Sequence, residues 1–209
     1  MLTLYSAEIC PFAQRTRAVL ARLDVPFECR EIDLSDRDPT FLRLTPTGKV
    51  PLLVDGELKL YESTVVGEYL AERYGWGAAL APEPELRSRQ RLAMKQWDDR
   101  VLPAWYRSLI DPRSFDAKAR GKVEGELDEA EATVAAMQGV TDNLMGFHVA
   151  PFWARMDWLR EHSPIPALID AHHGLRAWAD RAVGLPAILQ TLPDREFAVQ
   201  QYELHYVNR

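Results

Sequence analysis

The sequence has little cysteine, no long hydrophobic run and no excess of positive charge. Two cysteines among 209 residues cannot form a network of disulfides, as is usual in a reducing compartment. No run approaches the about eighteen apolar residues of a membrane span, and the N-terminus offers neither a basic leader nor an apolar signal core. The formal net charge of −6 argues against broad nucleic-acid binding. We therefore expect a cytoplasmic protein that binds neither membranes nor nucleic acid.

Metal and dithiol chemistry are not predicted either. The two cysteines and five histidines, including the pair His172-His173, lack the spacings of zinc ligands, so we expect no metal site. Ala13 stands where a dithiol oxidoreductase carries the second cysteine of a Cys-x-x-Cys motif. A mixed disulfide formed on Cys10 would therefore need an external thiol to resolve it.

Composition divides the chain into two parts. The first 74 residues alternate strand-like and helical patterns in the order β-α-β-α-β-β-α, whereas the part after Pro84 reads as helices. The clearest hairpin spans residues 50–61, with Asp55-Gly56 as its turn. We predict an α/β domain at residues 1–75, a linker at 76–84 and an all-helical domain at 85–209.

Cys10 opens the run Cys10-Pro11-Phe12-Ala13 directly after a short alternating segment, so it is predicted at the junction of a strand and a helix. Unpaired backbone N–H groups and the helix dipole favour an anion there and lower the pKa of a cysteine. We predict a reactive thiol that is largely ionised at neutral pH. The alternative is a small buried hydrophobe. Cys29 fits that alternative better, because alternation places it on the same strand face as Phe27, and we expect Cys29 in the core.

Two further positions are candidates for binding. Pro51 opens a strand, which indicates an edge position or a cis turn, and either leaves the backbone of Val50 unpaired. Glu62-Ser63 opens a helix and so creates a second anion site, or Ser63 is only a helix cap and Glu62 only a dipole-compensating acid.

The three motifs around Cys10, Val50-Pro51 and Glu62-Ser63 resemble, in this order and spacing, the thioredoxin-like domain of glutathione transferases. They are most similar to the cysteine-dependent, omega-like class. The runs at 175–178 and 184–187 look like late helices of the second domain of that family. The resemblance implies a glutathione transferase fold, in which an α/β thioredoxin-like N-terminal domain precedes an all-α C-terminal domain.

The resemblance also implies glutathione as co-substrate, with no permanently bound cofactor. The backbone of Val50, before the expected cis Pro51, would pair with the cysteinyl main chain of glutathione. The helix start at Ser63 would bind the γ-glutamyl carboxylate, and Glu62 the ammonium group.

Three more residues follow from the same resemblance. Phe12 would lie behind the site of the glutathione sulfur. Arg37 or Lys49 would reach the glycyl carboxylate, unless both are ordinary surface cations.

One departure from the family concerns a core helix of the second domain. Many members begin it with a serine or threonine cap and an aspartate three residues later, but the stretch that we align here is His148-Val149-Ala150-Pro151. Histidine is a poorer cap and proline cannot reciprocate, so we expect this helix to begin elsewhere or to fold less readily. The run at 151–156 resembles omega-like and stringent-starvation-type members instead.

These residues predict glutathione-dependent thiol transfer or reduction. A Cys10 thiolate would attack a disulfide or similar electrophile, and a second glutathione would release the mixed disulfide, with weak conjugation as a side reaction. Tyr5 is the candidate for a tyrosine-type mechanism, but its place at a strand end favours packing. The alternative is a non-catalytic regulator, because stringent-starvation-type relatives use this fold to bind RNA polymerase and generally lack a usable cysteine.

The partner molecules are predicted only in outline. The electrophile or disulfide would bind between the domains, beside aromatic residues such as Trp105, Tyr106 or Trp153, although most of the six tryptophans are expected in the core. The tail at 192–209 closes over this site or simply packs. The family usually forms two-fold dimers, so we expect a homodimer.

Overall fold

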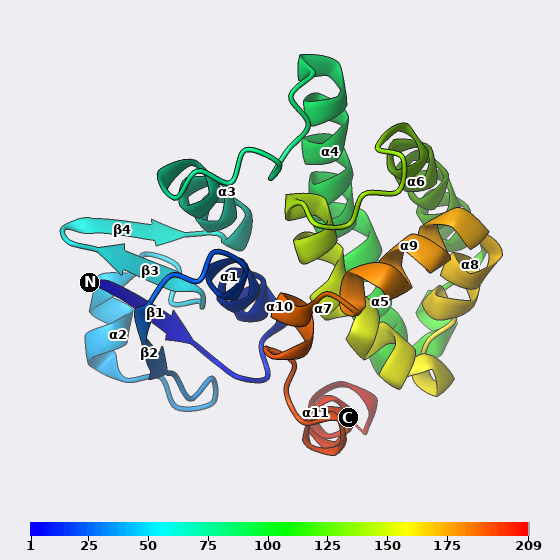
Figure 1. The fold of residues 1–209 in the computed structure, drawn as a ribbon. Helices are drawn as coiled ribbons and strands as arrows, with labels where there is room; N and C mark the ends of the chain where they lie inside the picture. Colours follow the sequence, from blue (N-terminus) through cyan, green and yellow to red (C-terminus); the bar gives the residue numbers. More distant parts are fainter. Residues whose placement is uncertain (209) are drawn as a thin grey trace.

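A computed structural model describes residues 1–208 and has a small α/β domain beside a larger helical one (Figure 1). The first domain holds a four-stranded sheet of order β2-β1-β3-β4, in which β1 pairs parallel with β2 and antiparallel with β3, and β3 pairs antiparallel with β4. The strands are β1 (Leu2–Ser6), β2 (Phe27–Glu31), β3 (Leu52–Asp55) and β4 (Leu58–Tyr61). Alternating residues of β1 are buried, with Leu4 fully enclosed, so the pattern of period two is realised.

The helices of this domain are α1 (Pro11–Arg22), α2 (Pro39–Leu44) and α3 (Ser63–Arg73). α1 and α3 pack with one face of the sheet and with the second domain in one large core, while Phe41 of α2 joins a smaller core with Leu52 and Ala13. The predicted order β-α-β-α-β-β-α is confirmed. The β3–β4 hairpin is also confirmed, but its two-residue turn is Gly56-Glu57, because Asp55 still pairs with Leu58. Of these two turn residues, only Gly56 has a positive φ, of 62°.

Cys29 is exposed, which contradicts its predicted place in the core. β2 lies at the edge of the sheet, and only its first residues are partly covered. A shared face with Phe27 is therefore not enough to bury Cys29, because the covering elements do not extend along the whole edge strand.

The second domain is helical throughout, as predicted. Its helices are α4 (Pro84–Gln96), the π-helical η1 (Trp97–Val101), α5 (Leu102–Ile110), the short η2 (Pro112–Ser114), α6 (Ala117–Ala136), α7 (Leu144–Trp158), the short η3 (Arg160–His162), α8 (Ile165–Ala171), α9 (His173–Val183), α10 (Pro186–Leu189), α11 (Arg195–Tyr202) and the π-helical η4 (Glu203–Val207). No helix in the part of the chain that the structure describes is long and apolar enough to span a bilayer.

The segment that connects the domains, between α3 and α4, is packed against the second domain. Trp76 is 7 % exposed, and its ring meets that of Phe147 edge-on, with centroids 5.2 Å apart. The backbone N–H of Leu144 donates to the carbonyl of Ala79 at 2.8 Å. The segment thereby fixes the first turn of α7 to the domain boundary.

Candidate functional site

Cys10 occupies the N-cap of α1, directly before Pro11, as the sequence predicts. Its backbone N–H donates to the carbonyl of Ala7 at 3.0 Å, and its carbonyl accepts from the N–H of Gln14 at 3.0 Å. The side chain is half-buried. The thiol therefore sits at the positive end of the helix, but in a partly enclosed position.

Burial raises the pKa of the Cys10 thiol above its ordinary value, although the nearby N–H groups of Ala13 and Phe12 and the charges of Arg155 and Arg17 all act to lower it. The expected ionisation at neutral pH is thus wrong for this state of the protein. The sequence pattern indicates the helix dipole correctly, but the loss of hydration on burial is the larger effect.

A groove of about 650 Å³ runs between the two domains, a volume typical of small-ligand sites. The first domain contributes Phe12, Thr47, Lys49, Val50, Pro51, Tyr61, Glu62, Ser63, Thr64 and Glu68, and the second contributes Arg91, Lys95, Asp98 and Asp99. The structure therefore brings together six of the seven residues assigned by resemblance to glutathione. Arg37 is the exception: it is exposed and does not line the groove.

The Val50-Pro51 peptide bond is cis, which is one of the two alternatives that the sequence left open. Val50 lies outside β3, whose pairing begins at Leu52, so its backbone takes no part in the strand ladder. Lys49, next to it, is exposed at the groove.

Glu62 has φ +69° and ψ 109° at the N-cap of α3, and its side chain makes no capping hydrogen bond. A positive φ is unfavourable for a residue with a side chain, and such strain is concentrated at ligand sites. Ser63 is buried within α3 and accepts a hydrogen bond from Arg15 Nη1 at 3.2 Å. Ser63 is therefore not the N-cap, and its hydroxyl is linked to α1.

Arg15 of α1 forms an ion pair across the domain boundary with Asp98 of η1. Its Nη2 and Nη1 atoms donate to the two carboxylate oxygens at 2.7 Å and 3.1 Å. His148 Nε2 lies 3.0 Å from Asp98 Oδ1, and the His148 carbonyl accepts from Arg15 Nε at 2.8 Å. Of the three side chains, only that of Asp98 lines the groove; Arg15 and His148 lie behind it, next to Ser63.

Electrostatics fixes the charge state of this cluster. Burial opposes ionisation of Asp98, but the charge of Arg15 and the hydrogen bonds from Arg15 and His148 hold its pKa well below the ordinary value. Burial and the neighbouring Arg15 charge lower the pKa of His148 to about 4. At neutral pH the cluster therefore contains one guanidinium, one carboxylate and a neutral imidazole.

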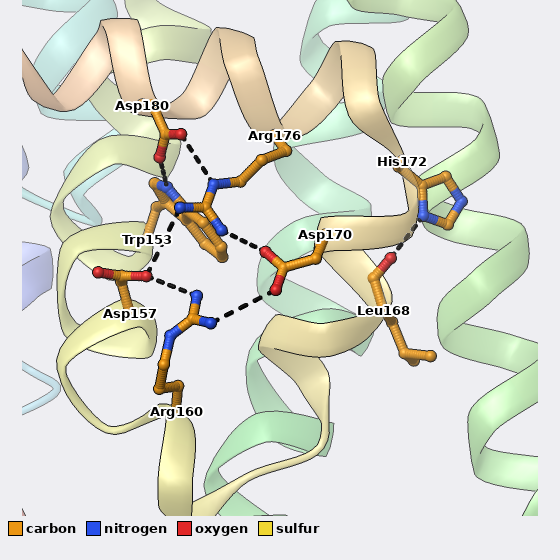
Figure 2. Close-up of polar contacts among 8 residues, drawn as sticks. All are labelled: Trp153, Asp157, Arg160, Leu168, Asp170, His172, Arg176 and Asp180. Atoms are coloured by element: carbon orange, nitrogen blue, oxygen red, sulfur yellow. Dashed lines mark hydrogen bonds and ion pairs between the residues drawn. The ribbon is translucent and has the colours of Figure 1, made fainter.

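The structure contradicts two of the three residues assigned to the second-substrate pocket. Trp105 is fully enclosed and Trp153 is 1 % exposed. Figure 2 shows Trp153 beside Arg176 and Asp180, where its Nε1 donates to Asp180 at 2.8 Å and its ring lies 4.9 Å from the Arg176 guanidinium carbon. Both tryptophans are core residues, because each large ring is more stable when buried.

Tyr106, the third candidate, lies against the C-terminal tail. Its ring centroid is 6.4 Å from that of Tyr202 in a stacked arrangement and 5.1 Å from that of Tyr206. Tyr202 is 4 % exposed, so α11 is packed firmly on the second domain. Of the three aromatic candidates, Tyr106 alone is partly accessible, and the tail packs against it. Arg209, the last residue of the tail, lies outside the described residues.

The core helix α7 begins earlier than our alignment to His148 implies. Its N-cap is Asn143, whose Oδ1 accepts from the N–H of Gly146 at 3.0 Å. Gly146 stands three residues after the cap, where many members have aspartate, and a Cβ there would lie 2.0 Å from the Thr141 carbonyl oxygen. No side chain fits at this position, which explains the departure from the family pattern.

The charged residues near the site carry little signal in the sequence and were not predicted. Arg15, Asp98 and His148 have no motif in common, since they come from three separated elements. Arg155 carried a signal: it interrupts the apolar run Phe152-Trp153-Ala154-Arg155-Met156. An arginine on a helix that is otherwise apolar all round is expected to be buried and bonded.

Comparison with known proteins agrees with this geometry. The model of the glutathione S-transferase N-terminal domain matches residues 4–84. A stringent starvation protein A homolog of Haemophilus ducreyi is 31 % identical over 168 residues, covering 75 % of each chain. Glutathione S-transferase omega-1 of Sus scrofa is 25 % identical over 197 residues, covering 90 % of this chain and 79 % of its own.

A similar fold is found in a rice glutathione transferase that was solved in complex with glutathione. The TM-score is 0.78 at 22 % identity, over 97 % of this chain and 96 % of the other. Together with the sequence relatives and the groove between the α/β and helical domains, these findings establish that the chain belongs to the glutathione S-transferase superfamily.

Proposed function

We propose that this chain is a cysteine-type, omega-like glutathione transferase that catalyses glutathione-dependent thiol transfer with Cys10 as its nucleophile. The observation that carries the proposal is the position of Cys10 at the N-cap of α1, with Phe12 two residues on lining a groove that also holds Val50, Pro51 and Glu62. These are the chemical features that an extended, charged tripeptide thiol requires.

Each end of glutathione has complementary groups in the groove. The free backbone of Val50 offers strand-like hydrogen bonds to its cysteinyl part. The N-terminus of α3 at Ser63 offers backbone N–H groups to the γ-glutamyl carboxylate, and the strained, exposed Glu62 offers a carboxylate to the ammonium group. Lys49 is the cation at the groove for the glycyl carboxylate.

The reaction proceeds by two thiol–disulfide exchanges. The Cys10 thiolate attacks the glutathione sulfur of a mixed disulfide RS–SG, an S–S bond forms between Cys10 and glutathione, and RS⁻ leaves and takes a proton. The thiolate of a second glutathione then attacks the bound glutathione sulfur, giving glutathione disulfide and releasing the Cys10 thiolate. The net change converts RS–SG and one glutathione into RSH and glutathione disulfide.

The test compares the wild type with Cys10→Ala. Reduction of hydroxyethyl disulfide by glutathione should fall to the uncatalysed rate in C10A, because the other cysteine, Cys29, lies on the edge strand β2 and not at the N-terminus of a helix, while glutathione binding measured by calorimetry should persist. Cys29→Ser is the matched control, and its activity should equal that of the wild type because Cys29 is exposed on β2. Activity that survives in C10A would refute the proposal.

A second candidate function is a non-catalytic regulator that binds a protein partner. The observation that favours it is the 31 % identity to a stringent starvation protein A homolog, together with the raised pKa of the Cys10 thiol. The same calorimetry separates the two candidates, since a regulator of this kind would bind no glutathione.

The proposal includes a homodimer, in which α3 and α4 form the shared face. Val65 of α3 and Leu92 of α4 are 52 % and 53 % exposed. The ion pair between Arg91 and Glu68, at 2.6 Å, links the two helices next to these side chains. Such exposed apolar side chains on neighbouring helices suit contact with a second copy.

Light scattering after size-exclusion chromatography should give twice the chain mass for the wild type. Val65→Glu should shift the protein towards the single-chain mass, because a charge at the contact is costly to desolvate. Val140→Glu is the control, since Val140 is similarly exposed, at 51 %, on the second domain. A wild type of single-chain mass at all concentrations would contradict the dimer.

A further inference from the structure

Arg155 of α7 is fully buried without a carboxylate partner. Its Nη1 donates to Gln14 Oε1 at 2.6 Å and to the Pro151 carbonyl at 2.7 Å, and its Nη2 donates to the Ile9 carbonyl at 3.3 Å. The Nε atom is buried with no hydrogen-bond partner. Among residues 1–208, no carboxylate lies within ion-pair distance of this guanidinium. A buried charge in this condition is unfavourable unless an anion accompanies it.

The hydrogen bonds of Arg155 bracket Cys10. Ile9 immediately precedes Cys10, and Gln14 lies one helical turn after it, so Arg155 reaches from the second domain to both sides of the cysteine. Arg17, from α1, donates to the carbonyls of Ala7 and Glu8 in the same loop. The turn that presents the thiol is therefore held between two guanidinium groups.

The other charged and titratable groups around Cys10 do not supply the missing negative charge. Arg15 is already paired with Asp98. Burial raises the pKa of Tyr202 to about 12 and that of Tyr106 well above its ordinary value, so both phenols stay neutral. The groups that face Cys10 or Arg155 electrostatically are Arg15, Arg17, Tyr106 and Tyr202. The carboxylate at this loop, Glu31, accepts from the Glu8 N–H and faces Arg17 instead of Arg155.

We infer that Arg155 is a positioning residue whose buried guanidinium is the counter-ion of the Cys10 thiolate. Its charge is balanced when Cys10 ionises, and its hydrogen bonds to Ile9 and Gln14 hold the turn that presents the sulfur. The catalytic meaning of this role rests on the proposed function. In the second exchange the Cys10 sulfur leaves as a thiolate, and a better stabilised thiolate is a better leaving group.

The experiment measures alkylation of Cys10 in the absence of glutathione, so that it does not depend on the proposed function. All proteins carry Cys29→Ser, because Cys29 is exposed and would also react. The rate of reaction with iodoacetamide is followed by mass spectrometry against pH. In Arg155→Met the midpoint of this profile should move up by about one pH unit, equivalent to an about tenfold lower rate at neutral pH. Arg155→Lys should restore most of the difference.

Arg176→Met is the matched control. Arg176 is an arginine of the same domain, but its ion-pair partners Asp157, Asp170 and Asp180 all belong to the second domain (Figure 2). Its alkylation midpoint should equal that of the parent protein. A merely structural role of Arg155 would lower the urea midpoint of Arg155→Met and leave the alkylation midpoint unchanged, and this result would overturn the inference.

A second readout uses the charge of the reagent. A guanidinium beside the sulfur attracts anions, so it should favour iodoacetate, which is negatively charged, over neutral iodoacetamide. The ratio of the iodoacetate rate to the iodoacetamide rate should therefore be higher for Cys10 than for Cys29, whose ratio is measured in the Cys10→Ser variant. The ratio for Cys10 should fall in Arg155→Met. If Arg155→Met does not fold, Arg155→Gln replaces it in this comparison. The comparison of Cys10 with Cys29 can be made without any substitution at Arg155. A ratio at Cys10 no higher than at Cys29 would refute the inference, whether or not the protein binds glutathione.

Discussion

Asp98 joins a guanidinium and an imidazole at the boundary between the domains. Among residues 1–208 it is the one carboxylate that pairs with Arg15, and Arg15 is almost fully enclosed, with 3 % of its side chain exposed. Removing one partner of a buried ion pair costs far more than the pair contributes, because the other charge stays buried and unpaired. Removal of Asp98 is therefore expected to destabilise the protein by more than the ion pair itself contributes to its stability.

Asp98→Asn should lower the free energy of unfolding by about 3 kcal/mol, since Arg15 would keep its charge without a counter-ion. Urea unfolding followed by circular dichroism measures the effect. Asp99→Asn is the control, because Asp99 pairs with the exposed Lys95 in an i,i+4 contact, which is worth about 0.3–0.5 kcal/mol. Equal losses in the two variants would show that Arg15 is satisfied by other groups.

Cys10 shows what local sequence can and cannot predict about a residue. The apolar spacing and Pro11 are local, so the helix start at Cys10 was predictable. The burial that raises its pKa was not, because it arises from packing in the folded protein, where residues far along the chain reach this turn, as Arg155 of α7 does through its hydrogen bonds to Ile9 and Gln14. The sign of a pKa shift depends on such distant neighbours, so a motif at a helix N-terminus does not fix it.

At the scale of elements, the first turn of α7 carries a cap that is buried rather than exposed. Asn143 is 3 % exposed and accepts from Gly146, while its Nδ2 donates to the Val140 carbonyl at 3.0 Å. This side chain therefore satisfies backbone groups on both sides of the helix start. The same turn receives the Leu144–Ala79 hydrogen bond from the connecting segment.

Asn143→Ala should lower the free energy of unfolding by about 1–2 kcal/mol, because the cap is lost and the Gly146 N–H and Val140 carbonyl lose a partner. Asn143→Asp, which keeps the accepting oxygen, should lose less. Thermal and urea unfolding of both variants check this order. If the alanine variant were as stable as the wild type, water would have to replace the cap without cost.

The helices and strands themselves were largely predictable from the sequence, but the exact residues at which caps and turns lie were not. Alternation and the Cys-Pro, Val-Pro and Glu-Ser motifs predict β1, the hairpin and the starts of α1 and α3. The helix α7 has its N-cap at Asn143 and not at His148, in agreement with the expectation that it starts elsewhere, but the position of its cap was not predicted, because Asn143 and Gly146 do not form the capping pattern that many members of the family have. The aromatic pocket was misassigned because large apolar residues look alike in a sequence whether they line a cavity or fill a core.

At the scale of the whole molecule, the buried His148 makes stability depend on pH. Its pKa is about 4 in the folded protein, against about 6.5 for an ordinary histidine. Between these values the unfolded chain binds a proton that the folded protein excludes, so the stabilisation is complete above pH 6.5 and is lost as the pH falls towards 4.

The expected loss over this range is about 3 kcal/mol from His148 alone. Urea unfolding at several pH values measures it, and His148→Gln should flatten the dependence between pH 6.5 and 4. His205→Gln is the control, because His205 is exposed on η4 and should leave the slope unchanged. An unaltered slope in His148→Gln would show that other groups take up the protons.

The packed segment between α3 and α4 is expected to make the protein resistant to limited proteolysis between its domains. Exposed connections between domains are common sites of proteolysis. Here Trp76 is buried and the Ala79 carbonyl accepts a hydrogen bond from Leu144, so this part of the segment cannot readily adopt the extended conformation that a protease binds. A fragment ending at residue 84 would also carry Arg15 away from Asp98. The two domains are thus expected to unfold in a single calorimetric transition, and the α/β half is not a module that can be transplanted by itself.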